Sequence, residues 1–389
     1  MYRYVRQLGE AIRKGDLVLL ILCLAATAFG CLMVASATSY MGAARLVVIQ
    51  IIAALLGVLF FLIVSSVDAE FFSEHRTALV VFNTLLLLLL IPFGTDNGTG
   101  NKSWLDLPIL PVNIQPAEIC KITYVLIMAS VMAAHQNQIS SFRSVIHMSI
   151  HLGLLVGMNL VLSSDMGVSL IFVFIFIGMA FAGGVNMFWF LAAAGMVVLL
   201  APVAWQFLDE YQKVRFQILY DPNIDPEGIG PRWHTKNSLM SLTGGGMMGQ
   251  GLFNGHRTQR GDLNAQHTDY IFAAIGEELG FVGCAVVMIL LLCIVARCIW
   301  VGTRSPDYMR RMICFGCASA LIFQIISNVG MCIGLTPVIG LTLPFISYGG
   351  SSIVSLYAMM GLVSGVYARP APTSHERYIR PPISTYACH

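Results

Sequence analysis

Long apolar runs separated by short polar segments dominate the chain. Ten of the runs are long enough to cross about 30 Å of hydrocarbon as a helix. A break at Gly183-Gly184 predicts two helices joined by a very short turn in place of one long helix. The pattern predicts an all-α, polytopic membrane protein, with about ten spans at 16–37, 46–67, 77–93, 116–134, 144–162, 166–184, 186–206, 269–297, 312–335 and 351–368.

Composition supports this prediction. Of 389 residues, 57% are hydrophobic and 11% charged, whereas a soluble domain has about 25% charged residues. The net charge is only +2, and the basic residues are scattered, which argues against a nucleic-acid partner. The ten cysteines lie mostly in apolar runs and indicate no disulfide framework.

The distribution of Lys and Arg in short loops predicts the orientation. More of them lie on the side of the N-terminus, so we expect a cytoplasmic N-terminal segment, 1–15, and a cytoplasmic tail, 369–389. The loop 94–115 and the large extracytoplasmic loop 207–268 then face outward. We expect one transmembrane domain over 1–389, in the bacterial cytoplasmic membrane.

Charged residues gather at the predicted outer ends of the spans, whereas the inner halves are almost free of acids. Charges near a membrane are costly, so each is a candidate for function. Together they predict a polar cavity open to the outer leaflet, formed around Arg45, Glu118, Lys121, Asp165, Asp269, Glu277 and Glu278.

Helical spacing relates these charges to one another. Glu118 and Lys121 share a helix face, either as a structural ion pair or as a preset cation that receives phosphate. Asp269 stands at a helix start, where it is either a cap or a catalytic group. At about 100° per residue, Glu277 shares the side of Asp269, and Glu278 faces a neighbouring helix.

Two other patterns favour simpler interpretations. Gly244-Gly-Gly246-Met-Met-Gly249 matches GxGxxG, but no strand and helix surround it. We interpret it as flexible backbone that a lipid headgroup can approach. His147 and His151 share a helix face with no nearby acid, which favours helix packing over a metal site.

Several motifs resemble those of the shape, elongation, division and sporulation (SEDS) family of peptidoglycan polymerases. Gln266-His-Thr-Asp-Tyr-Ile-Phe-Ala, followed by Gly276-Glu-Glu-Leu-Gly280, is similar to its HTDFIFA…EELG signature. Leu343-Pro-Phe-Ile-Ser-Tyr-Gly-Gly-Ser-Ser352 resembles the second signature, and Gln115-Pro-Ala-Glu-Ile-Cys-Lys121 resembles QPSExxK. Two positions depart from the pattern: Ser103 stands where an Arg usually precedes Trp104, and Ile49, not a basic residue, precedes Gln50.

The resemblance implies polymerisation of lipid II, the undecaprenyl-pyrophosphate-linked disaccharide-pentapeptide, on the outer face of the membrane. It assigns catalysis to Asp269 and places Glu118 and Lys121 in the same cavity. The other candidate substrate-binding residues are Arg45, Lys102, Trp104, Arg215, His267, Thr268, Glu277, Ser347 and Ser351.

The expected chemistry is one inversion at the anomeric carbon, which needs one general base. Pyrophosphate leaves without protonation if cations stabilise its charge. Lys121, Arg45, Arg215 or a divalent cation, Mg²⁺ or Mn²⁺, would fill that role, and no other cofactor is expected.

Two other functions fit parts of the pattern: a lipid II flippase, which is a transporter, and a non-catalytic scaffold. The chain lacks the SxxK and KTG motifs of transpeptidases. The resemblance therefore implies a class B penicillin-binding protein as partner, beside other proteins of the elongation or division complex. We expect the partner's helix to pack on small residues of span nine, namely Gly316, Ala318, Ser319 and Ala320.

Overall fold

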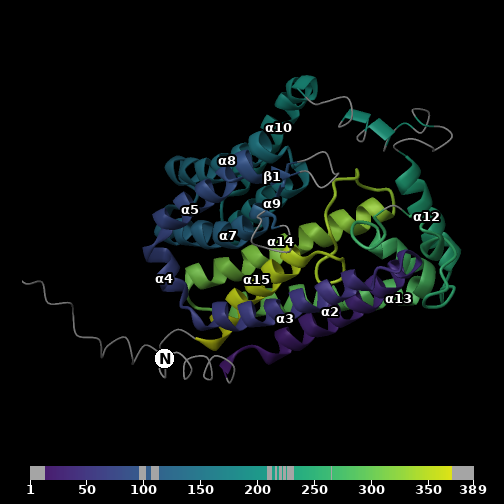
Figure 1. The fold of residues 1–389 in the computed structure, drawn as a ribbon. Coiled ribbons are helices and arrows are strands. Elements are labelled where there is room, and N and C mark those ends of the chain that lie inside the picture. The colour runs from purple at the N-terminus through teal and green to yellow at the C-terminus, as the bar shows by residue number, and fades with distance from the viewer. Residues whose placement is uncertain are drawn as a thin grey trace, which may run out of the picture.

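The computed structural model is a bundle of long helices (Figure 1). It describes residues 14–95, 102–106, 114–207, 232–263 and 265–369, together with residues 213, 214, 217, 218, 221 and 225.

All ten predicted spans are helical. Eight helices are long and apolar enough to cross a membrane, counting α5 and α6 as one, and the two shorter apolar helices are α9 and most of α10. The helices of the ten spans are α2 (Leu17–Ala37), α3 (Ala44–Ser66), α5 (Arg76–Leu88) with α6 (Leu90–Phe93), α7 (Pro116–Ala134), α8 (Phe142–Ser163), α9 (Met166–Ala182), α10 (Met187–Phe207), α13 (Ile271–Arg304), α14 (Tyr308–Cys332) and α15 (Gly350–Ala368).

Short elements connect the spans. The helix α12 (Trp233–Gly245) precedes α13, and β1 (Gly94–Thr95) pairs antiparallel with β2 (Trp104–Leu105). The other elements of the described residues are α4 (Ala69–Glu74) and the 3₁₀ turns η1 (Ser39–Met41), η2 (Gln136–Gln138) and η4 (Thr258–Arg260). As predicted, α9 and α10 are separate helices with a turn at Gly183 and Gly184.

The helices α15, α14 and α7 form the buried centre of the bundle. α15 packs closely along α3, because a Cβ at Gly361 would lie 2.7 Å from the carbonyl oxygen of Phe61. In contrast, α10 stands at the edge of the bundle, and every residue from 191 to 200 is exposed (Figure 1).

The predicted partner surface on span nine is wrong. Gly316, Ala318 and Ala320 are buried inside the bundle, and a Cβ at Gly316 would meet Met179 and Val125 at 2.8 Å. Small residues here allow α14 to approach α7 and α9, so they are already used within the chain.

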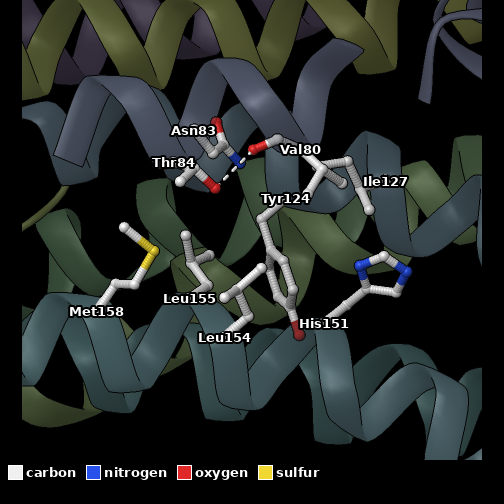
Figure 2. A pocket seen from close by; sticks show the side chains of 9 residues that line it. All are labelled: Val80, Asn83, Thr84, Tyr124, Ile127, His151, Leu154, Leu155 and Met158. Carbon is white, nitrogen blue, oxygen red and sulfur yellow. Dashed lines mark hydrogen bonds between the residues drawn. The ribbon is translucent and has the colours of Figure 1, made fainter. Parts of the chain in front are cut away.

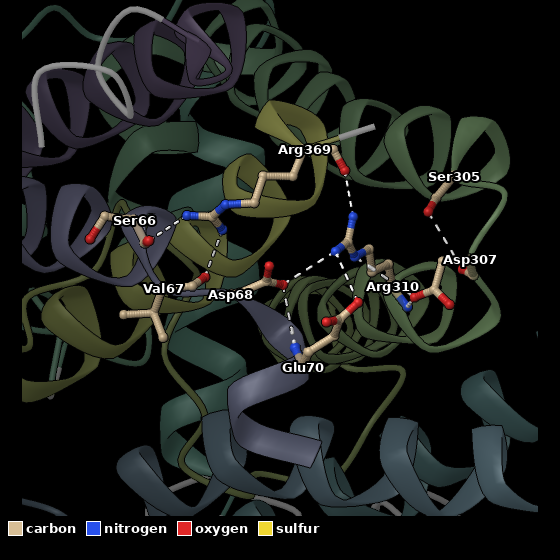
Figure 3. Close-up of polar contacts among 8 residues, drawn as sticks. All are labelled: Ser66, Val67, Asp68, Glu70, Ser305, Asp307, Arg310 and Arg369. Carbon is tan, nitrogen blue, oxygen red and sulfur yellow. Dashed lines mark hydrogen bonds and ion pairs between the residues drawn. The ribbon is translucent and has the colours of Figure 1, made fainter. Parts of the chain in front are cut away.

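At one end of the bundle, the Arg310 guanidinium holds together the segments that carry its partners (Figure 3). Its ion pairs reach Asp68 at 3.2 Å, Glu70 at 3.7 Å and Asp307 at 3.8 Å. It also donates to the carbonyl of Arg369 at 2.6 Å. We call this the Arg310 end. The opposite end, where α13 and α15 begin, is the Asp269 end.

Candidate functional site

The two signature segments, 266–269 and 343–349, contact each other at the Asp269 end. The Ser347 hydroxyl donates to the carbonyl of Thr268 at 2.6 Å, and the amide of Tyr348 donates to the carbonyl of His267 at 2.8 Å. Ser347 also accepts a bond from the Leu343 amide at 2.8 Å. Segments about 80 residues apart in sequence are therefore joined through Ser347 and Tyr348, and the Leu343 amide fixes the Ser347 hydroxyl.

Asp269 lies at the centre of this junction. The Asn328 amide donates to the carbonyl of Asp269 at 2.8 Å and to that of Leu341 at 2.7 Å. The Asp269 carboxylate lies beside Gly340, where a Cβ would be 3.8 Å from its Oδ2. The helix α13 has Tyr270 at its cap position, so Asp269 stands one residue before the cap.

Glu118 and Lys121 form the predicted ion pair at the start of α7. Their side chains are 2.9 Å apart, and Lys121 is completely buried. The second oxygen of Glu118 accepts a bond from the Ser355 hydroxyl on α15. Since Ser347 lies in the loop just before α15, one segment of chain links the neighbour of Asp269 to the partner of Lys121.

A third acid, Asp165, caps α9 beside this pair. Its Oδ1 accepts the Val168 amide at 3.0 Å, and its Oδ2 accepts the Gln115 side chain at 3.2 Å. Burial raises the pKa of Asp165, although the Val168 amide and the Ser103 hydroxyl lower it. The Ser103 hydroxyl is therefore near this carboxylate, but it is buried without a hydrogen-bond partner among the described residues.

The loop 339–341 separates Asp165 from Asp269. A Cβ at Gly167 would lie 2.5 Å from the carbonyl oxygen of Ile339, so the start of α9 touches this loop directly. Gly340, with φ of +71°, then faces Asp269. The acidic residues predicted from separate motifs therefore lie on adjoining elements.

Sequence reasoning missed Gln50 as a contributor. Completely buried on α3, it donates to the carbonyl of Ser347 at 3.0 Å and accepts the Gly349 amide at 3.2 Å. A glutamine inside an apolar span was the available signal. Arg45, about one turn earlier on α3, is exposed. Burial raises the pKa of Tyr348, and the positive charge of Arg45 partly offsets this rise.

The two glutamates of α13 face different partners. Glu278 accepts bonds from Ser36 of α2 and from Gln259, which confirms that it faces a neighbouring helix. Both oxygens of Glu277 are engaged by the turn η4, through the Arg257 and Thr258 amides, each at 2.9 Å, and the Thr258 hydroxyl at 2.6 Å. Substrate contact by Glu277 stays a prediction.

The remaining candidates differ in exposure. His267 Nδ1 and Ser351 Oγ are buried without a hydrogen-bond partner, and Thr268 donates to Ala265 at 3.2 Å. Burial lowers the pKa of His267. Lys102 is exposed, Trp104 is partly buried in β2, and Arg215 lies outside the described residues.

No group of three His, Cys, Asp or Glu among the described residues could hold a metal ion. His147 lies between His135 and His151, with ring centroids 5.1 Å apart on either side. His151 lines a small cavity between α5, α7 and α8, with Tyr124, Asn83 and apolar side chains (Figure 2). A divalent cation therefore stays a prediction.

The fold and the site define a multi-pass helical membrane protein whose polar residues converge at the start of several helices. The sequence model of the FtsW, RodA and SpoVE family, described as cell cycle protein, matches residues 16–370. The chain belongs to this family, which is the SEDS family indicated by the motifs.

The matches to known relatives and solved structures cover most of the chain. The probable peptidoglycan glycosyltransferase FtsW of Trichlorobacter lovleyi is 33% identical, over 88% of this chain and 91% of its own length. The peptidoglycan glycosyltransferase MrdB of Escherichia coli K12 is 30% identical, over 80% and 83%.

Among solved structures, a chain of a peptidoglycan synthase complex that coordinates polymerization and crosslinking has a TM-score of 0.77. It is 27% identical, and the match covers 91% of this chain and 97% of that one. The rod shape determining protein RodA of Thermus thermophilus has a TM-score of 0.68 at 25% identity, over 92% and 98%.

Proposed function

We propose that this chain is a peptidoglycan glycosyltransferase that polymerises lipid II, with Asp269 as its general base. The relatives named above support the enzyme class. The observation that carries the assignment of the site is the fixed junction of the two signature segments around Asp269. The same α15 segment holds the partner of Lys121.

The reaction is a single displacement. A hydroxyl of the acceptor sugar attacks the anomeric carbon of the donor, and the bond from that carbon to the pyrophosphate oxygen breaks. Asp269 takes the proton of the hydroxyl, and the pyrophosphate leaves as an anion. A well-placed general base contributes about 10²–10⁴ in rate.

Cations at the Asp269 end would stabilise the leaving pyrophosphate. Lys121 is held rigidly by Glu118, whereas Arg45 is exposed and forms no hydrogen bond or ion pair with the described residues. Lys121 therefore acts as a fixed charge, and Arg45 can move to meet the substrate. Asn328 and Gln50 are positioning residues, because they bind backbone on either side of the junction.

The test is incubation of the purified full-length chain with lipid II. Formation of glycan strands supports the polymerase. Transfer of the headgroup across a vesicle membrane without any product would instead identify a flippase, and the absence of both would favour a scaffold.

The same proposal places both termini in the cytoplasm and the Asp269 end outside. A cysteine at Asn254 should react with an impermeant thiol reagent on intact cells, and one at Arg310 only after lysis. Labelling of position 310 from outside would reverse the orientation and exclude an external active site.

A crosslinking partner of the class B penicillin-binding type completes the proposal, since a usable wall needs peptide crosslinks as well as strands. The similarity to a synthase complex that couples the two activities supports it. Co-purification from native membranes tests it, and repeated failure to recover a crosslinking enzyme would contradict it.

A further inference from the structure

The glycine-rich turn 246–251 fills a break in α13. At Gly280, φ is 68° and ψ is −164°, so the helical hydrogen bonds are interrupted. The freed carbonyls of Glu277 and Glu278 accept the amides of Gln250 and Gly251, each at 2.9 Å. Every such group needs a partner at membrane depth, and the turn provides them.

Amides of α13 also donate hydrogen bonds to carbonyls of the turn. The amide of Phe281 donates to the carbonyl of Gly246 at 2.9 Å, and that of Val282 to Met247 at 3.2 Å. This contact requires glycine on both sides. A Cβ at Gly280 would lie 2.4 Å from the Gly249 amide, and one at Gly249 would lie 2.2 Å from the Glu278 carbonyl. The glycines therefore permit close backbone packing, which replaces our interpretation of flexible backbone.

The tip of this rigid turn is strongly apolar and exposed. Met247 is 65% exposed and Met248 is 78% exposed, beside Phe281 at 63%. These side chains continue the exposed apolar face of α13, which runs on through Val282, Val286, Ile289 and Leu292. Since α13 is long and apolar enough to cross a membrane, an exposed apolar face on it is suited to contact lipid, and the turn extends that face.

The length of α13 sets the depth of the turn. At the Arg310 end, Arg297 and Arg304 lie over the Trp300 ring at 4.2 and 4.5 Å, which is typical of a membrane boundary. Twenty residues separate Trp300 from Gly280, and at about 1.5 Å each they cover roughly 30 Å, the thickness of the hydrocarbon layer. The break therefore lies at the opposite boundary.

We propose that the turn 246–251 is a re-entrant element, which inserts Met247 and Met248 among the acyl chains of the lipid leaflet at the Asp269 end. The occupant is lipid and not protein, because the apolar tip is continuous with the lipid-facing side of α13. Flexible methionine side chains also adapt to a fluid surface. The element fixes residues 271–279, and with them Asp269, at the depth of the lipid headgroups.

Thiol accessibility tests the depth. Met248→Cys is compared with Asn254→Cys, an exposed position outside the turn, and with Ile289→Cys in the span. The full-length variants are reconstituted in liposomes of phosphatidylethanolamine and phosphatidylglycerol, with a charged maleimide on both sides. Because hydrocarbon excludes the thiolate and the reagent, position 248 should react at least about tenfold more slowly than 254, as 289 does.

Reaction of position 248 at the rate of 254 would overturn the proposal. Protection in native membranes that disappears in liposomes would also overturn it, in favour of a protein partner. Each rate is corrected for the unmodified chain, in which Cys293 is the exposed thiol among the described cysteines. Phe281→Cys is a second variant, expected to be protected like 248, and thermal unfolding verifies that each variant is folded.

Discussion

The two ends of the bundle treat their charged groups differently. At the Arg310 end, two cations are matched by acids of the same chain. Arg310 contacts Asp68, Glu70 and Asp307 (Figure 3), and Arg297 pairs with Asp16 at 2.8 Å. Arg369 donates to the carbonyls of Ser66 and Val67, so it ties the end of α15 to the end of α3.

The Asp269 end is organised by backbone contacts and leaves side-chain groups available. Ser347, Gln50 and the side-chain nitrogen of Asn328 form hydrogen bonds to backbone carbonyls and amides. Meanwhile, His267 Nδ1 and Ser351 Oγ are buried without a partner. Lys121 has three donors and uses one, for Glu118, among the described residues.

This difference indicates that the Arg310 end stabilises the fold, whereas the Asp269 end can bind a ligand. Charges that hold a fold together are satisfied within the fold, since an unpaired buried group is costly. Unused donors and cations beside a rigid backbone are instead what a charged ligand requires. The following predictions test whether the two ends separate stability from activity in this way.

The largest effect is expected for Asp269→Asn. Loss of the base should lower glycan synthesis at least about 10²-fold. The unfolding temperature should change little, because asparagine keeps the shape of the side chain and still accepts hydrogen bonds, and Asn328 binds the backbone of residue 269. Strand formation from lipid II and thermal unfolding are measured together. Asp262→Asn, in the loop before α13, is the matched control and should keep its activity. Near-normal synthesis by Asp269→Asn would leave the mechanism without a base.

Arg310→Gln should show the reverse behaviour. Hydrogen bonds to a charged group contribute about 1.5–3 kcal/mol, reduced here because Asp68, Glu70 and Asp307 are partly exposed. We expect a loss of about 1–2 kcal/mol in unfolding free energy, with the activity per folded molecule kept. Arg311→Gln is the control, since Arg311 forms no ion pair with the described residues. An active-site defect without loss of stability would contradict the distinction.

The pair Glu118–Lys121 is both a buried ion pair that can stabilise the fold and a candidate substrate-binding group. Its variants therefore test whether one pair of residues can do both. Lys121→Met should lose more than half of the activity, and Glu118→Gln should also lower it. If the pair is only structural, the joint variant relieves the remaining buried charge and recovers. If Lys121 contacts pyrophosphate, recovery fails. Polymerisation and unfolding are measured for the three variants, with Ser355→Ala, which removes the hydroxyl bound to Glu118 and keeps both charges of the pair.

The length of the apolar runs made the spans predictable, and nine of the ten helices begin and end within four residues of the expected bounds. The ends differed most at α13, which runs to Arg304, because Arg297 remains helical while its head group pairs with Asp16. The pairing of Glu118 with Lys121 followed from helix spacing alone.

Contacts between distant segments could not be predicted. Nothing in local pattern indicates that Gln50 would bind residues 347 and 349, or that Glu277 would hold η4. The small residues around Gly316 also looked like a lipid-facing surface, because spacing along one helix does not tell which neighbour it meets. Gly280 breaks α13 only because a distant turn supplies the missing hydrogen bonds.

His267 provides the smallest test. Burial lowers its pKa below the usual 6.5, so protonation is easier in the unfolded chain than in the folded one. Its contribution to stability is therefore complete above about pH 6.5 and is lost as the pH falls below that value. His267→Gln should remove this contribution, which reduces the fall in unfolding temperature between pH 7.5 and 5.5 by about one or two degrees.

His256→Gln, at an exposed position of the preceding loop, is the control and should keep the wild-type profile. An unchanged profile for His267→Gln would mean that this imidazole is as free to take up a proton as in the unfolded chain. It would then be able to carry a positive charge beside Asp269, and the Asp269 end would hold one more cation for the substrate.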